Sequence, residues 1–212
     1  MKHKFLVIAL SLTLLLCFAL GVTLAWITAR TPSIQNVFTT VGITLRLEET
    51  FNTDTNSDGV NDAWKAKLYP GAVYAKDPVV TVEEGSEACW LFVHIDDTGN
   101  AFTNGDQIIG WSINNGAGWT LLADATDAED NPLANVYYIE LVDAVATDAS
   151  YQVLQGGDGD LANGKVTISN LLDSTNMPGS DLTITVTAYA VQHTGFATAL
   201  DAWNEAKMIP EA

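Results

Sequence analysis

The stretch Ala88-Cys89-Trp90-Leu91-Phe92-Val93-His94-Ile95 decides the fold. Side chains alternate between the two faces of a β-strand. One face would carry Cys89, Leu91, Val93 and Ile95, and the other would carry Trp90, Phe92 and His94. Because both faces are largely apolar, the pattern predicts a central strand that is covered on both sides.

Shorter runs of strand type lie on both sides of this stretch, separated by turns rich in Gly and Asp. They span residues 43–47, 79–82, 107–113, 119–122, 136–142, 151–154, 166–171 and 182–191. Their order lacks the strand–helix–strand rhythm of a parallel sheet. The sequence therefore predicts an all-β fold, an antiparallel β-sandwich, with one or two short helices at 61–68 and 198–208.

The first 25 residues predict a secretory signal. A short basic end precedes an almost unbroken apolar run over 5–20, and small residues then lead to Ala25. This order predicts a signal helix in the precursor and a cut between Ala25 and Trp26. The alternative is an uncleaved membrane anchor, although the run is near the lower limit for a spanning helix. The mature chain would be a tether over 26–36 and a single domain over 37–212.

The balance of charges limits the partners. The chain has 212 residues, 26 of them acidic and nine basic. Cleavage would remove two lysines and no acid, leaving seven basic residues against 26 acidic ones, a formal net charge of −19. Such a surface repels nucleic acid and anionic membranes, because it offers no basic patch. We expect no nucleic-acid partner and no stable membrane insertion after cleavage.

Cysteine usage indicates that the domain is held by packing, metal or partners. Cys17 leaves with the predicted signal, so Cys89 remains alone and no intrachain disulfide is possible. The apolar neighbours of Cys89 favour a buried, inert thiol over a nucleophile.

The segment 54–62 places oxygen-bearing groups at alternate positions, as a loop around a hard cation does. The expected Ca²⁺ ligands are Asp54, Asn56, Asp58, Asp62 and the backbone carbonyl of Val60. The start matches an EF-hand, but Lys65 stands where a bidentate Glu belongs, so a loop of the thrombospondin type 3 style fits better. The alternative is an acidic surface turn. The segment 156–160 is a second, less complete candidate.

Three sequence strings in and before the predicted central strand, taken in order, carry a resemblance to a known family. They are Lys67-Leu68-Tyr69-Pro70-Gly71, Lys76-Asp77-Pro78-Val79-Val80-Thr81-Val82 and Gly85-Ser86-Glu87-Ala88-Cys89-Trp90-Leu91-Phe92-Val93. In this order they resemble the TasA/camelysin family of secreted Gram-positive proteins. The segment 21–42 is similar to family precursors cut by the SipW signal peptidase, and the ending over 188–203 is similar to clostridial members.

This resemblance implies a jelly-roll-like sandwich that polymerises into fibres of a biofilm matrix, outside the cell or at its surface. The mature N-terminus would complete the sheet of the next subunit, a form of strand addition. The donor would then run from Trp26 to Val41 and include the tether over 26–36, the candidate donor arm. Its anchors would be Trp26, Ile27, Ile34, Val37 and Phe38. The alternative is that 37–47 forms the first strand of its own domain. The implied partners are copies of the chain, a SipW-type signal peptidase and an accessory assembly protein.

Two other functions stay open. A monomeric surface module, such as one that binds glycan, would use exposed aromatic residues such as Trp111, Trp119 and Tyr137. Camelysin has been described as a metalloprotease, which suggests a metallopeptidase. The sequence has no His-Glu-x-x-His motif, and outside the signal it has only His94 and His193. We therefore expect no enzymatic activity.

Overall fold

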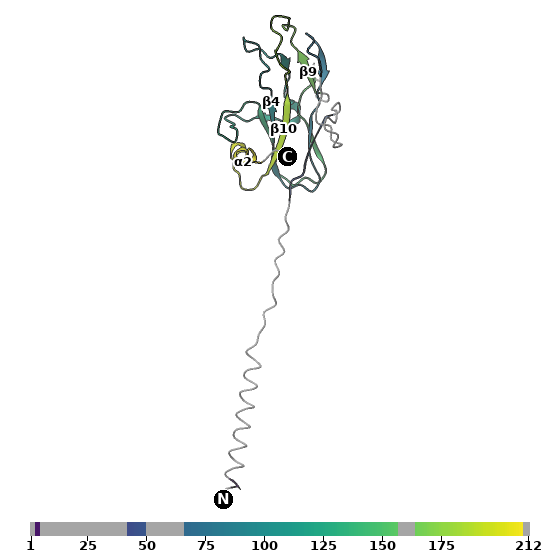
Figure 1. Ribbon diagram of the computed structural model, residues 1–212. Coiled ribbons are helices and arrows are strands. Elements are labelled where there is room, and N and C mark those ends of the chain that lie inside the picture. The colour runs from purple at the N-terminus through teal and green to yellow at the C-terminus, as the bar shows by residue number, and fades with distance from the viewer. Residues whose placement is uncertain (1–2, 5–41, 50–65, 157–163, 210–212) are drawn as a thin grey trace. The chain divides into compact units, whose positions relative to one another are not determined.

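The computed structural model describes residues 3–4, 42–49, 66–156 and 164–209. The chain divides into two units, Met1–Thr40 and Val41–Ala212, and all the described strands lie in the second. Strands dominate it, and one α-helix occurs in the described part (Figure 1). Within these ranges, no helix is long and apolar enough to cross a membrane. The predicted signal over 1–25 lies outside the described residues, apart from residues 3 and 4.

Ten strands in the described ranges form three sheets, and every pair of strands is antiparallel. The first sheet, in the order β1-β3-β8, contains β1 (Leu45–Glu48), β3 (Val79–Val82) and β8 (Ala149–Gln152). The second, in the order β10-β4-β7-β6, contains β4 (Cys89–Asp96), β6 (Thr120–Leu121), β7 (Val136–Leu141) and β10 (Thr185–Gln192). The third, in the order β2-β9-β5, contains β2 (Val73–Ala75), β5 (Ile109–Gly110) and β9 (Lys165–Ile168). The prediction of an antiparallel, mostly β chain is confirmed.

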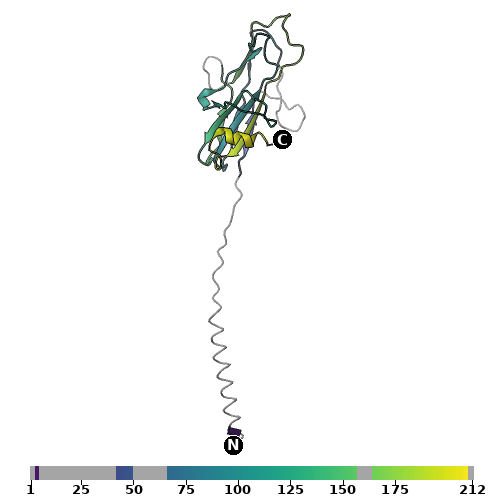
Figure 2. The same ribbon diagram turned by 90° about the vertical axis from the view of Figure 1, so that its left-hand side faces the viewer.

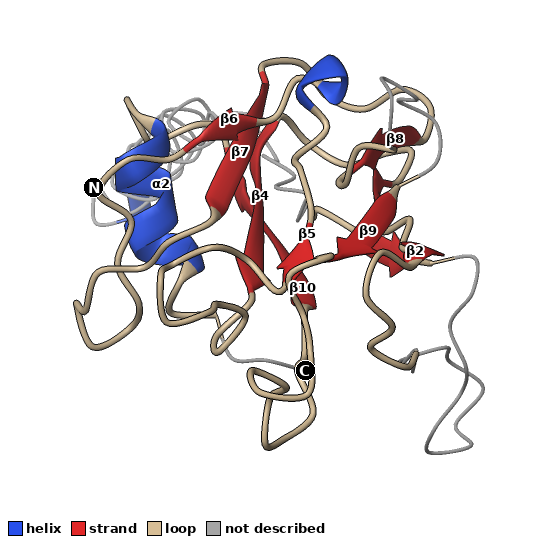
Figure 3. Cartoon of the chain, turned by 90° about the horizontal axis from the view of Figure 1, so that it is seen from above, coloured by secondary structure: helices blue, strands red, loops and turns tan. Residues whose placement is uncertain are grey.

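Strand β4 is central, as its two apolar faces predict. It pairs with β10 on one side and β7 on the other, so that Leu91 lies opposite both Ala190 and Ile139. Its first face contributes to the main core, which also takes buried residues from β3, β5 and β9. Its second face contributes Trp90 and Phe92 to a smaller core. Seen from above, the second sheet lies between α2 (Ala199–Ala206) and the other two sheets (Figure 3).

Helix α2 covers the second face of β4. Its buried residues, Ala199, Ala202, Trp203 and Ala206, recur at the spacing of one helical face. The hydroxyl of Thr198 caps the helix by accepting a hydrogen bond from the Asp201 amide at 3.2 Å. The indole of Trp203 donates to the Thr126 carbonyl at 2.8 Å. Figure 2 shows the helix lying across the strands. The helix predicted over 198–208 is confirmed, with a shorter range.

The ends of several other predicted elements are wrong, and β5 is the clearest case. The run 107–113 predicts a long strand, but only Ile109–Gly110 pairs with β9. The side chain of Asn100, 3 % exposed, accepts from the Ile109 amide at 2.7 Å and donates to the Ile109 carbonyl at 2.8 Å. The backbone groups of Ile109 point away from β9, so the Asn100 side chain occupies the edge of β5 where a further strand would otherwise pair.

Three further differences concern β8, β2 and the segment 61–68. The strand predicted over 151–154 is β8 at Ala149–Gln152, while Val153 and Leu154 are buried beyond its ladder. Strand β2 has only three residues and was not predicted. Of the helix predicted over 61–68, only 66–68 are described, and they are not helical.

Candidate functional site

Most residues that the sequence singles out for function lie outside the described ranges. They are the cleavage pair Ala25 and Trp26, the anchors Ile27, Ile34, Val37 and Phe38, and the expected Ca²⁺ ligands Asp54, Asn56, Asp58, Val60 and Asp62. Their predicted roles stay predictions. What the structure describes is the part of the domain to which these segments attach.

The candidate donor arm attaches to β1, which is an edge strand. Leu45 lies opposite Val82 and Glu48 opposite Val79, so β1 pairs with β3 on one side. Leu45 is half-buried on the main core, while the other three residues of β1 are exposed. Residues 45–48 thus form the first strand in the described part of the domain, and of the alternative strand over 37–47 only 42–47 are described.

Strand β10 is the second edge at this corner of the domain. It pairs with β4 and is the terminal strand of its sheet. Val186, Ala188 and Ala190 pack against the main core. Strands β1 and β10 lie close together, yet the described residues form no ladder between them. Two neighbouring edges of this kind leave backbone groups to which a further strand can bond.

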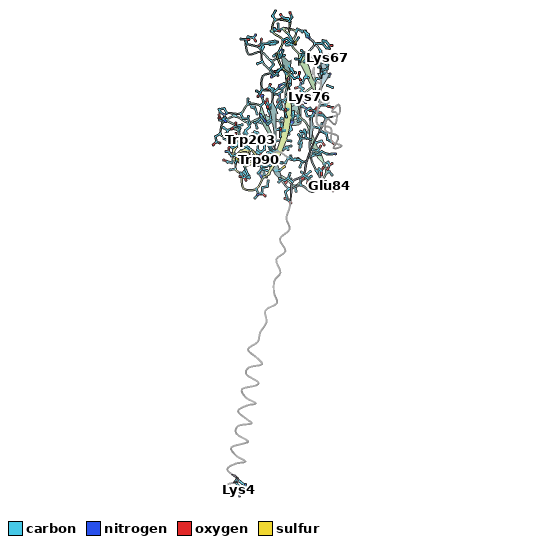
Figure 4. All side chains as sticks on the ribbon, viewed as in Figure 1. Lys4, Lys67, Lys76, Glu84, Trp90 and Trp203 are labelled. Carbon is cyan, nitrogen blue, oxygen red and sulfur yellow. The ribbon has the colours of Figure 1, made fainter. Side chains whose placement is uncertain are left out.

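The predicted Ca²⁺ loop has both ends tied beside β2. The Lys76 ammonium lies 2.8 Å from the Glu49 carboxylate, and both side chains are 11 % exposed. The Tyr74 hydroxyl donates to the Lys67 carbonyl at 2.6 Å. These contacts hold the chain just before and just after 50–65 near one strand. Figure 4 shows Lys67 and Lys76 toward one end of the domain and Glu84 toward the other.

The second acidic candidate, 156–160, has its ends at the same place. The Lys76 amide donates to the Gly164 carbonyl at 2.9 Å, and the Lys165 amide donates to the Gln155 carbonyl at 3.3 Å. Asp158 and Asp160 themselves lie outside the described ranges. Two acid-rich segments far apart in the sequence therefore begin and end beside residue 76.

The two histidines do not form one metal site with each other. His94 lies opposite Thr187 on β10. His193 directly follows β10 and is six positions after Thr187. At roughly 3.3 Å per residue, they are about 20 Å apart. His193 instead bonds the Glu140 carboxylate at 2.7 Å and stacks on Trp90 with ring centroids 5.2 Å apart. In the described part, no group of three or more residues of the types His, Cys, Asp and Glu is placed to hold a metal.

The aromatic residues suggested for glycan binding are buried or half-buried. The prediction that Trp119 is exposed is wrong: it is 4 % exposed and donates to the Gln152 carbonyl at 3.0 Å. Trp111 is half-buried and donates to the Asp97 carboxylate at 3.0 Å. Tyr137 is also half-buried, and burial, followed by the charge of Asp97, raises its pKa.

Cys89 is buried, as predicted. Its side chain faces the main core with no exposed surface, and burial raises the pKa of its thiol to about 11. Its inertness toward reagents stays a prediction.

Sequence reasoning missed the roles of two polar residues, the buried Ser86 and the half-buried Asp97. Ser86, 2 % exposed, bonds the amide of Thr44, and Asp97 accepts hydrogen bonds from four side chains. The turn that contains Ser86 was predicted, but a turn motif does not say which distant strand its hydroxyl meets.

Comparisons with known proteins add no relative. No protein-family model, no curated protein and no solved structure matches the chain at a significant level.

Proposed function

We propose that this chain is a secreted structural subunit of extracellular fibres, and that it assembles when the N-terminal arm of one copy adds a strand to the next. Its partners would be copies of itself, a SipW-type signal peptidase and an accessory assembly protein. Its place would be the extracellular matrix or the cell surface. The proposal rests on the signal pattern over 1–25, on the resemblance to TasA and camelysin, and on the edges of two sheets.

The neighbouring edges of β1 and β10 carry the proposal. Each strand is terminal in its sheet and the two lie close together, and among the described residues no strand pairs with the outer edge of either. Strand addition at such an edge gains main-chain hydrogen bonds, and apolar anchors select the register. Donation that runs head to tail without closing produces a filament.

The order of the strands supports the finer assignment of a jelly roll. In that fold the early strands pair with the late ones, from the outside of the sequence inward. Here β2 pairs with β9, β3 with β8 and β4 with β7. The first and last strands, β1 and β10, lie close together without a ladder. The pairings of β1 with β3, β4 with β10, β5 with β9 and β6 with β7 are not part of this scheme.

We also propose that the loop 54–62 binds Ca²⁺. Support comes from the spacing of its oxygen ligands and from the attachment of its two ends beside β2, through Glu49 and Lys67. A closed loop needs less ordering to surround an ion than a free segment does.

Electron microscopy of the mature chain, residues 26–212, tests the assembly. Filaments are expected from this chain, and a folded monomer is expected from a chain that lacks residues 26–36. A third chain, in which 26–36 are replaced by a Gly-Ser segment of equal length, separates the effect of arm length from that of its anchors. The mature chain staying monomeric at high concentration would reject the fibre function. Filaments from the shortened chain would reject the donor role of the arm alone.

A further inference from the structure

Three backbone amides fix the start of the domain against the turn between β3 and β4. The Thr44 amide donates to the Ser86 hydroxyl at 3.0 Å. The Glu83 amide donates to the Thr44 carbonyl at 3.0 Å, and the Glu87 amide donates to the Gly42 carbonyl at 3.3 Å. These bonds lie ahead of the first rung of the β1–β3 ladder, between Leu45 and Val82.

The turn that forms these three hydrogen bonds is itself held in place by others. The Gly85 amide donates to the Val145 carbonyl, and the Val145 amide donates to the Ser86 carbonyl, both at 2.8 Å. The Glu84 amide donates to the Asp148 carboxylate at 2.9 Å. Ser86 is 2 % exposed, so the acceptor of the Thr44 amide is a buried hydroxyl on a braced turn. This site is called the Ser86 clamp below.

Burial alone would make β1 an easy strand to exchange. Three of its four residues are exposed, and the ion pairs of Arg46 with Glu48, Glu83 and Asp148, at 3.4, 3.9 and 3.7 Å, lie on the surface. Exposed pairs of this kind stabilise little. An arm that carried β1 with it would swap an identical element between copies, which is a low-cost route to association.

We infer that the Ser86 clamp sets the limit of the exchanged segment: β1 stays on its own subunit, and only residues before Gly42 are free to pair with a neighbour. Ser86 is then a positioning residue for assembly. Release of β1 would break the three hydrogen bonds and leave the buried Ser86 hydroxyl without the hydrogen bond that it accepts from the Thr44 amide. Release of the residues before Gly42 would break none of the three. The inference rests on the proposed strand exchange, and the clamp itself can be tested on the monomer.

Hydrogen–deuterium exchange on the mature chain, residues 26–212, kept dilute enough to stay monomeric, tests the clamp without assembly. The Thr44 amide should be protected, and Ser86→Ala should speed its exchange about tenfold, the effect of one lost hydrogen bond. Ser150→Ala is the matched control, because it removes an exposed hydroxyl bonded to Thr81 at 2.8 Å on the far side of β3. Exchange at Thr44 that is as fast in the parent chain as in Ser86→Ala would overturn the clamp.

A disulfide lock between β1 and β3 tests the limit of exchange in the mature chain. Glu48 and Val79 lie opposite each other on the outer face, so Glu48→Cys/Val79→Cys can form a bond, and buried Cys89 does not compete. The oxidised variant should form filaments as fast as its reduced form. Filaments that appear only after reduction would show that β1 must leave, which overturns the inference and keeps the proposed function. If neither the parent nor the locked chain assembles, the proposed function fails, and the exchange experiment still decides whether the clamp exists.

Discussion

At the scale of single residues, Cys89 offers the cleanest chemical test of the interior. Its thiol has a pKa of about 11, so at pH 8 about one molecule in a thousand carries the reactive thiolate. We expect iodoacetamide to label the folded mature chain at least about a hundredfold more slowly than the chain unfolded in urea. Mass spectrometry of the labelled protein measures both rates. Equal rates would mean that the end of β4 opens readily.

The same thiol makes stability depend on alkaline pH. Burial raises its pKa from 9.0 to about 11, so the unfolded chain loses this proton at a lower pH than the folded chain does. The stabilising contribution is therefore complete below about pH 9 and is lost as the pH rises toward 11. Urea unfolding of Cys89→Ala should show a shallower fall in free energy over this range than the parent chain. Parallel curves would contradict this assignment.

Asp97 joins segments that are distant in the sequence. One carboxylate oxygen accepts from Asn135 at 2.9 Å, and the other accepts from Trp111 at 3.0 Å and Gln107 at 3.3 Å. Asp97→Asn places an amide among these donors, so we expect a loss of about 1–3 kcal/mol in the free energy of unfolding. Asp106→Asn, at an exposed carboxylate, is the control. Urea titrations of both variants test this, and an unchanged midpoint for Asp97→Asn would contradict it.

At the scale of elements, α2 is held by one large side chain. Trp203 is 1 % exposed and packs edge-on against Phe92 and Tyr189, with ring centroids 5.4 and 5.5 Å away. Trp203→Ala should reduce the free energy of unfolding by about 3–5 kcal/mol, through lost burial and a cavity. Asn204→Ala, on the exposed side of the same helix, should change it little. Similar urea midpoints for the two variants would mean that the helix is not part of the cooperative unit.

The elements also show how far the sequence can predict this fold. Strand β4 and helix α2 were predicted because their apolar residues follow one period over a whole element. The ends of β5 and β8 were not, because burial and bonding continue where the ladders stop. Asn100 bonds Ile109 on the edge away from β9, and Val153 is buried without belonging to a ladder. The edges of β1 and β10 follow from the order of strands, which no local pattern contains.

At the scale of the whole molecule, charge opposes both folding and assembly. The predicted mature chain carries a formal net charge of −19, from seven basic and 26 acidic residues. Among the described residues, Arg46, Lys76 and Lys207 already pair with carboxylates. Copies of such a chain repel one another at low salt, so a bound divalent cation would favour the compact state and the close approach of subunits.

Calcium should therefore stabilise the molecule through the loop 54–62. At an ion concentration about a hundredfold above the dissociation constant, binding contributes about 2.7 kcal/mol, which corresponds to a rise in Tm of roughly 5–10 °C for a domain of this size. Asp58→Ala removes one expected ligand and should abolish most of the rise. Asp143→Ala, at an exposed acid outside both acidic segments, should keep it. Differential scanning calorimetry with calcium and with an equal ionic strength of NaCl separates site binding from screening. An equal rise with NaCl would reduce the calcium effect to general screening of the acidic surface.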